Sequence, residues 1–202
     1  MDIEPDYGTL AQAEQLIKEA NDLGIKLIVD IVPNHTSSDH KWFQAALKAG
    51  PGSPERNRYM FRDGKGPNGD LPPNNWEAVF GGCAWERVIE ADGKAGQWYL
   101  HLFAVEQPDL NWENPEVVAH LEDVLKFWLD RGVAGFRIDV AHGMFKEKGL
   151  PDIRKDPAAS MLGTEHKPFW DQEGVHDIYR AWRKILDSYP GDRMAVAEAW
   201  VS

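Results

Sequence analysis

The sequence predicts an α/β fold built on parallel strands, and two observations support this prediction. Three short runs, at residues 26–32, 132–138 and 194–197, are almost wholly apolar, which is typical of strands that are covered on both faces. Segments with apolar residues at helical spacing alternate with these runs. Strands that alternate with helices pair in parallel and are joined by right-handed crossovers.

The first helix is predicted between Thr9, which is suited to cap its start, and Gly24, which is suited to end it. Apolar residues recur at helical spacing between them (Leu10, Ala13, Ile17 and Ala20). Residues 26–32 then form the first strand, which we expect to be buried on both faces. Its mid-strand acid, Asp30, is expected to be hydrogen-bonded within the sheet.

Residues 37–111 differ in character from the segments on either side. Glycine, proline and asparagine are frequent, and helical periodicity is weak after Leu47. Aromatic residues interrupt the pattern: Trp76, Phe80, Trp85, Trp98, Tyr99 and Phe103. This composition predicts an irregular or β-containing insertion with a core of its own.

Regular structure resumes with a helix that Asn114 caps and Pro115 opens. Apolar residues then mark one face of this helix as far as Gly132. After it we expect a strand ending at Asp139, a polar stretch, an amphipathic helix and a last strand ending at Glu198 (residues 133–139, 146–171, 175–186 and 194–198).

Composition and charge exclude several classes of function. The 33 acidic and 22 basic residues give a net charge of −11, which argues against a nucleic-acid partner because its phosphates would be repelled. No apolar run reaches the ~18 residues of a membrane span and no signal peptide is seen, so we predict no membrane partner. A cytoplasmic location is predicted, on the condition that Met1 is the true start. The single cysteine, Cys83, excludes an internal disulfide.

Two carboxylates end two of the predicted strands. Asp139 and Glu198 each follow a short apolar run, where a charged side chain is expected only if it points into a site that uses it. Because neighbouring parallel strands end at the same edge of a sheet, both acids should face one cleft. Two such carboxylates are the minimum that glycoside hydrolysis requires.

The surroundings of the two acids predict different tasks for them. Arg137 lies two residues before Asp139 and projects on the same face, where it would keep Asp139 ionised, as a nucleophile needs. Glu198 lies among apolar residues that include Val196 and Trp200. Burial should therefore raise the pKa of Glu198 and suit it to donate a proton.

Two histidines lie near the same predicted edge. His35, with Asn34, follows the end of the first strand, which favours a substrate-binding role. His142, just after Asp139, either supports the site from behind or is exposed, and the sequence leaves both interpretations open. Three early acids are expected to be solvated rather than to hold a metal ion (Asp2, Glu4 and Asp6).

Four motifs follow one another along the chain. They are Asp-Ile-Val-Pro-Asn-His at 30–35, Gln-Pro-Asp-Leu-Asn at 107–111, Gly-Phe-Arg-Ile-Asp at 135–139 and Ala-Glu-Ala-Trp at 197–200. Together they resemble the α-amylase family of glycoside hydrolases, and the second motif resembles its oligo-1,6-glucosidase and α-glucosidase branch. The resemblance implies a partial TIM (β/α)8 barrel, about strands 3 to 5, with an inserted domain B after the third strand.

The resemblance also implies three consecutive segments. Residues 1–36 would be a barrel segment with helix 2 and strand 3, residues 37–111 the inserted domain B, and residues 112–202 the barrel from helix 3 to strand 5. The barrel is then incomplete at both ends. We therefore expect a fragment of a longer enzyme that is inactive alone.

By the same resemblance, Asp139 would be the nucleophile and Glu198 the general acid/base. Arg137 would be the partner of the nucleophile, and His35 would bind the glucose unit at the cleavage point. Domain B would help to close this pocket with Gln107, Phe103 and Phe80. The implied activity is retaining hydrolysis of α-glucosidic bonds in disaccharides or short oligosaccharides of the maltose or isomaltose type.

No cofactor or metal is implied for this chain, because the calcium loop of this branch belongs to a missing N-terminal part and the family's third catalytic Asp lies beyond residue 202. One alternative is a transglucosylase or isomerase that resembles trehalose synthase, and another is a non-catalytic amylase-like relative. Val140 resembles the residue of α-1,6-acting members, but the choice between α-1,4 and α-1,6 bonds stays open. The oligomeric state is also left open.

Overall fold

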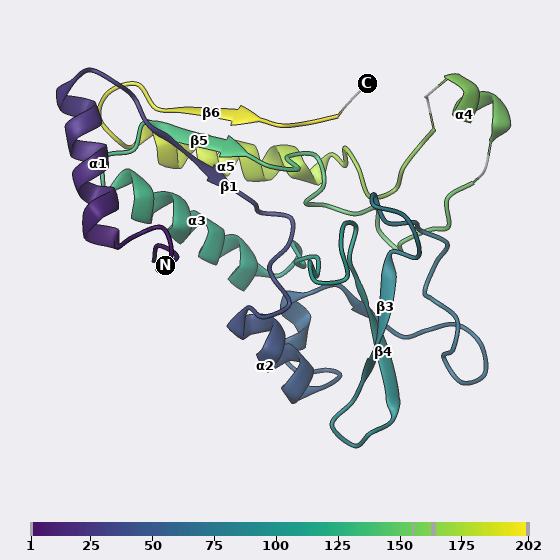
Figure 1. Ribbon diagram of the computed structural model, residues 1–202. Helices are drawn as coiled ribbons and strands as arrows, with labels where there is room; N and C mark the ends of the chain where they lie inside the picture. Colours follow the sequence, from purple (N-terminus) through teal and green to yellow (C-terminus); the bar gives the residue numbers. More distant parts are fainter. Residues whose placement is uncertain (1, 155, 163–164, 201–202) are drawn as a thin grey trace.

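Three parallel strands form the sheet on which the described part of the chain is built. The computed structural model describes residues 2–154, 156–162 and 165–200. In it β1 (Ile28–Ile31), β5 (Gly135–Ile138) and β6 (Met194–Ala197) pair in the order β1-β5-β6. Figure 1 shows the three strands side by side and pointing the same way. The predicted strands are confirmed, although β1 and β5 are shorter than their apolar runs.

The register of this sheet decides which side chains are neighbours. Arg137 of β5 is paired with Asp30 of β1. Beyond the last paired position of β6, the Glu198 N–H donates to the carbonyl oxygen of Ile138 at 2.9 Å. Asp139 and Glu198 therefore occupy adjacent positions at the ends of two neighbouring strands.

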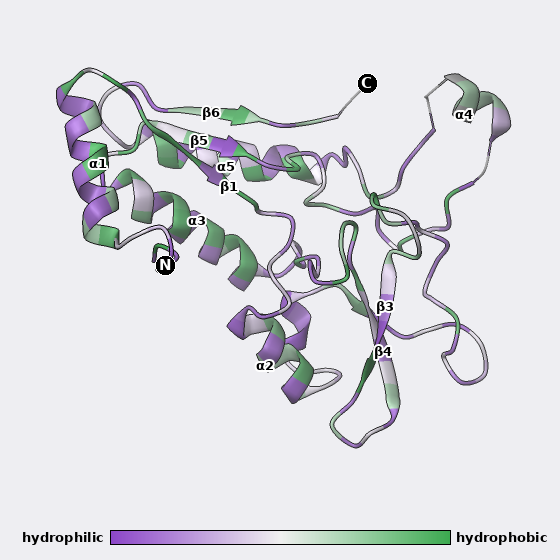
Figure 2. Ribbon diagram, in the orientation of Figure 1, coloured by the Kyte–Doolittle hydropathy of each residue, from purple (hydrophilic) through white to green (hydrophobic). Residues whose placement is uncertain are grey.

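Three helices accompany the sheet: α1 (Leu10–Asp22), α3 (Pro115–Leu129) and α5 (Gly174–Asp187). The N-caps of α1 and α3 are as predicted, since the Thr9 hydroxyl accepts the N–H of Gln12 and the Asn114 side chain accepts the N–H of Glu116. In Figure 2 hydrophobic and hydrophilic residues alternate along α5, as expected for a helix with one face in the core. Buried residues of α3, β5 and α5 form this core (Leu121, Leu125, Leu129, Phe136, Ile138, Ile178, Trp182 and Leu186).

The other face of the sheet is open, as expected of an incomplete barrel, which corrects the expectation drawn from the apolar pattern of the first strand alone. Ile28 and Val32 are 43% and 44% exposed, and no residue of β6 is buried. Side chains alternate between the two faces of a strand, so Ile28, Asp30 and Val32 share the face that points away from α3 and α5. Within the described ranges nothing covers that face, and β1 is therefore buried on one side only.

A second, antiparallel sheet lies between β1 and α3 in the sequence. A helix and a 3-10 turn precede its strands: α2 (Lys41–Ala49) and η1 (Arg56–Arg58). The strands then pair in the order β2 (Phe61–Arg62), β4 (Ala95–Leu100) and β3 (Trp85–Ile89). Figure 1 shows this group set apart from the parallel sheet. The β-containing character predicted for this stretch is confirmed, while its bounds as a domain stay a prediction.

The core predicted for the insertion is present, and the insertion also packs into the main core. A second buried cluster, around Trp76 and Trp85, takes all its buried residues except Phe169 from residues 37–111. Phe43 and Tyr59 belong instead to the same buried cluster as α3 and β5. Large aromatic side chains reach across segment boundaries and join the insertion to the rest of the protein.

The polar stretch between β5 and α5 contains a short helix that the sequence pattern does not predict, α4 (Pro157–Leu162). The Asp156 carboxylate accepts the Ala158 N–H at 2.9 Å and so caps its start. Figure 1 shows α4 at the far end of a long loop. Among the helices in the described ranges, none combines the length and apolar character that crossing a membrane requires.

The close approach of β5 and β6 predicts the effect of adding one methyl group. A Cβ at Gly135 would collide with the carbonyl oxygen of Met194, whereas a Cβ at Gly24 would meet open space. Gly24→Ala should carry only its backbone cost of about 1 kcal/mol. Gly135→Ala should cost more than about 3 kcal/mol, because backbone atoms of β6 must move.

Urea unfolding of the full-length protein that carries this chain measures both costs. Equal unfolding free energies for Gly135→Ala and Gly24→Ala would show that β6 does not lie against β5 as described.

Candidate active site

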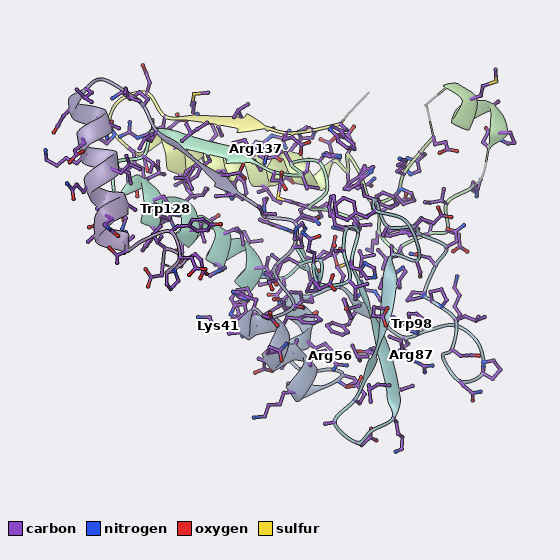
Figure 3. The ribbon with its side chains drawn as sticks, viewed as in Figure 1. Lys41, Arg56, Arg87, Trp98, Trp128 and Arg137 are labelled. Atoms are coloured by element: carbon purple, nitrogen blue, oxygen red, sulfur yellow. The ribbon has the colours of Figure 1, made fainter. Side chains whose placement is uncertain are left out.

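Three carboxylates surround one guanidinium at the ends of the parallel strands. Arg137, which is labelled on β5 in Figure 3, lies 2.6 Å from Asp139 and 2.8 Å from Asp30 through Nη1. Its Nη2 lies 4.0 Å from Glu198. The predicted pairing of Arg137 with Asp139 and the predicted hydrogen bond of Asp30 are both confirmed. The structure therefore brings the two candidate catalytic acids together around one cation.

The spacing of the two acids follows from the geometry of the sheet. Neighbouring strands lie about 4.8 Å apart. Asp139 and Glu198 occupy adjacent register positions and both approach the Arg137 side chain. This backbone spacing is close to the separation of about 5–5.5 Å between the two carboxyl groups that retaining glycoside hydrolysis needs.

The charge of Arg137 is held firmly at this position. Its hydrogen bonds, first to Asp30 and then to Asp139, raise the pKa of the guanidinium. A cation that stays protonated and is hydrogen-bonded to two carboxylates holds both of them in a defined direction. The Asp139 side chain is 27% exposed and is therefore accessible to a substrate.

Glu198 lies in more polar surroundings than its sequence neighbours suggest. Its Oε2 accepts the N–H of Val140 at 3.1 Å, and its side chain is 34% exposed. Val196 and Trp200 are exposed rather than packed around it. The argument from apolar neighbours is therefore wrong, because residues next to each other along a strand need not touch in an uncovered sheet. Its role as proton donor stays a prediction.

Val140 turns the chain sharply between the two acids. It has φ = 48°, which is rare for a β-branched residue. This backbone lets its N–H reach Glu198 while its carbonyl accepts the N–H of Gly143 at 3.0 Å. Such strain, of order 1–3 kcal/mol, persists only where surrounding contacts fix the chain, and it is common at functional sites.

Four of the predicted pocket residues form one group, which we call the His35 cluster: His35, Gln107, Phe103 and Phe80. The Gln107 amide lies 3.0 Å from Nε2 of His35, and the Phe103 ring lies 5.3 Å from the His35 ring. Phe80 extends the cluster 5.7 Å from Phe103 and is 73% exposed. Burial lowers the pKa of His35, so its imidazole is neutral at pH 7 and can accept or donate a hydrogen bond.

A buried ion pair beneath this cluster was missed by the sequence analysis. Lys146 Nζ lies 2.7 Å from Asp109 Oδ2, and the two side chains are 2% and 0% exposed. The same ammonium donates to Asn34 at 3.0 Å, and Asn34 donates to Asp109 at 3.1 Å. Burial lowers the pKa of Lys146, and the Asp109 charge opposes that shift. The pair ties together the segments that follow β1 and β5 and the segment that precedes α3.

Trp170 was also missed, because it lies in a stretch that looks polar in sequence. Its ring is 6.2 Å from Phe103 and 4.5 Å from His142. His142 is 5% exposed and is therefore buried behind Trp170, which settles the alternative that the sequence left open. Burial lowers the pKa of His142, and the charge of Glu198 opposes this shift. The His142 ring therefore lies near Glu198 as well as against Trp170.

The remaining polar candidates lie apart from this site. Asp2, Glu4 and Asp6 are exposed, as predicted, and Cys83 is an exposed thiol. Among the residues that the structure describes, no three His, Cys, Asp or Glu side chains are grouped so that they could hold a metal ion.

Comparison with known protein families shows which family the chain belongs to. The alpha-amylase family, described as the alpha amylase catalytic domain, matches residues 1–202. The chain belongs to the alpha-amylase family. This confirms the resemblance carried by the four motifs and the predicted partial (β/α)8 barrel, since the catalytic domain of this family is a TIM barrel.

Individual alpha-amylase family relatives cover almost the whole chain. The oligo-1,6-glucosidase of Parageobacillus thermoglucosidasius is 41% identical over 198 residues, which are 98% of this chain and 33% of that protein. The crystal structure of Bacillus licheniformis trehalose-6-phosphate hydrolase gives a TM-score of 0.83 at 38% identity and covers 100% of this chain. Isomaltulose synthase from Erwinia rhapontici NX5 gives 0.84 at 38% identity over 98% of this chain. The chain spans about a third of the length of each of these relatives.

The buried ion pair predicts a large difference between two lysines of this alpha-amylase family chain. Lys146→Met leaves the Asp109 carboxylate buried without its cation, which should cost about 3–5 kcal/mol. Lys65→Met removes a lysine whose pair with Asp152 is more than half exposed on both sides. That change should cost at most about 1 kcal/mol.

Urea unfolding of the two variants gives both values. If Lys146→Met costs no more than Lys65→Met, the Asp109–Lys146 pair is not the buried link described above.

Proposed function

We propose that this chain is the central part of a retaining α-glucosidase that hydrolyses short α-glucosides. The observation that carries the proposal is the pair Asp139 and Glu198 on adjacent strand ends, with Arg137 between them. The names of similar proteins support it, because the relatives include oligo-1,6-glucosidases, maltases and α-glucosidases.

In the first step of the proposed reaction, the Asp139 carboxylate attacks the anomeric carbon of the glucose unit. The glycosidic bond breaks, and Glu198 gives its proton to the departing oxygen. In the second step, Glu198 takes a proton from water, whose oxygen attacks the anomeric carbon and releases Asp139. Arg137 fixes the direction of the Asp139 carboxylate throughout.

The His35 cluster provides one wall for the glucose unit in this proposal. Its neutral imidazole can hydrogen-bond to a sugar hydroxyl without the cost of burying a second charge. The exposed ring of Phe80, beside Phe103, offers an apolar surface to a sugar face. A wall of this kind favours a chain end, and hence disaccharides and short oligosaccharides over polymer.

A second candidate function is transfer of glucose to a sugar instead of water. The likeness to isomaltulose synthase, at 38% identity, favours it. Both reactions share the covalent intermediate and differ in which acceptor attacks it. The ratio of free glucose to new disaccharide, measured with sucrose and with maltose, separates the two functions in the full-length protein.

The proposed nucleophile can be tested against a matched neighbour. Asp30→Asn and Asp139→Asn each remove one carboxylate charge from the same Arg137 cation. Asp139→Asn should lower kcat by on the order of 10³-fold or more, since no other group can form the covalent intermediate. Asp30→Asn should lower kcat far less, because Asp30 only holds Arg137.

Steady-state kinetics of the full-length protein on an aryl α-glucoside measure both effects. Equal losses in the two variants, or an active Asp139→Asn protein, would reject Asp139 as the nucleophile and support a structural role for the acids.

The open sheet predicts that residues 1–202 alone are inactive. Apolar side chains of β1 and β6 are exposed, including Ile28, Val32 and Met194. Sheet edges and faces of this kind favour association over a stable monomer. Turnover of an α-glucoside by a monomeric 202-residue protein, assayed after size-exclusion chromatography, would contradict this expectation.

A further inference from the structure

A cleft of about 640 Å³ opens beside Trp170, outside the His35 cluster. We call it the Trp170 cleft. Its walls come from the segment before β3, the loop that carries α4 and the end of the chain after β6. Residues that the argument uses are Trp170, Trp200, Glu77, Asp156, Glu165 and Lys167.

The Trp170 cleft lies on the side of Glu198. Trp200 lines it and follows Glu198 by two residues. Trp170 lies against His142, whose pKa responds to the Glu198 charge. In the proposed reaction Glu198 gives its proton to the departing oxygen, so groups on its side meet the leaving part of the substrate.

Two indole rings make the cleft suitable for a sugar. Trp170 and Trp200 both line the cleft, and Trp170 is half-buried. An indole ring that lines a cleft is a common platform for a flat apolar face, and one face of a pyranose ring is apolar. The cleft therefore has the shape and the surface for a second sugar unit.

The charges around the cleft restrict which sugar it accepts. Of the charged lining residues that the structure describes, three are carboxylates and one is an ammonium (Glu77, Asp156, Glu165 and Lys167). The whole chain carries a net charge of −11. A phosphate group, with about two negative charges at neutral pH, would be repelled by this wall.

We propose that the Trp170 cleft binds the leaving sugar as an uncharged unit and rejects a phosphorylated one. The inference rests on the proposed α-glucosidase function and narrows its substrate class. It separates this chain from the similar proteins that are named trehalose-6-phosphate hydrolases, one of which is 48% identical over 150 residues. The selectivity comes from repulsion of the wrong substrate as much as from contact with the right one.

The test compares kcat/KM of the full-length protein for isomaltose, maltose, trehalose and trehalose 6-phosphate. At least one neutral disaccharide should exceed trehalose 6-phosphate by tenfold or more. A value for trehalose 6-phosphate equal to or above that of every neutral disaccharide would overturn the inference. Turnover of α-glucosyl fluoride is measured as a control, because its single-atom leaving group does not reach the cleft.

The control with α-glucosyl fluoride distinguishes failure of the uncharged-sugar inference from failure of the α-glucosidase proposal. Turnover of α-glucosyl fluoride together with a preference for the phosphorylated sugar rejects only the uncharged-sugar inference. If neither α-glucosyl fluoride nor any disaccharide is turned over, the α-glucosidase proposal fails, and the inference fails with it.

A charge-reversed variant tests the cause of the preference. Glu77→Lys combined with Glu165→Lys changes two wall carboxylates and spares Asp156, which caps α4. The ratio of kcat/KM for trehalose 6-phosphate to that for the best neutral disaccharide should rise by tenfold or more. Glu19→Lys, an exposed change on α1, is the control and should leave this ratio unchanged. An equal ratio in the double variant and the control would show that the cleft charges do not select the substrate.

Discussion

The register of the β1-β5-β6 sheet is the constraint on which the candidate site depends. It places Asp30 beside Arg137 and brings Asp139 and Glu198 to adjacent strand ends. The spacing of two parallel strands, about 4.8 Å, then supplies most of the distance that a nucleophile and a proton donor need. A slip of one residue in β6 would turn Glu198 to the opposite face and separate it from Arg137. The glycine at position 135 protects this arrangement, because any Cβ there would push β6 away.

A second constraint holds the loops around the strand ends. The Asp109–Lys146 pair is buried, and its net contribution to stability is small compared with the cost of removing one partner. Its importance is therefore geometric. The pair holds three segments together: Asn34 next to His35, the chain that follows Asp139, and the segment that contains Gln107. The sheet therefore positions the two acids, and the buried pair positions the loops that carry the His35 cluster. In the proposed function these two groups face one glucose unit.

Much of this arrangement could be predicted from local pattern. The caps at Thr9 and Asn114, the three strands and the contact between Arg137 and Asp139 all follow from periodicity and spacing. Features that depend on contacts between distant segments could not be predicted in this way. Lys146 and Trp170 lie in a polar stretch, and only folding brings them to Asp109 and Phe103. The surroundings of Glu198 were predicted wrongly, because sequence shows which residues are apolar but not whether an element covers them. The open face of β1 contradicts the apolar pattern of that strand taken alone but agrees with a barrel that is incomplete at both ends.

The covalent intermediate is the central claim of the proposed function, and trapping it is the most direct test. The full-length protein is treated with a fluorinated α-glucosyl fluoride whose glucosyl ester hydrolyses slowly, then digested and analysed by mass spectrometry. Attack by the Asp139 carboxylate releases fluoride and leaves one glucosyl ester. The proposed mechanism predicts that ester on the peptide containing Asp139 and its loss in Asp139→Asn. A label on Asp30 or Glu198, or turnover with no label and inverted product, would contradict it.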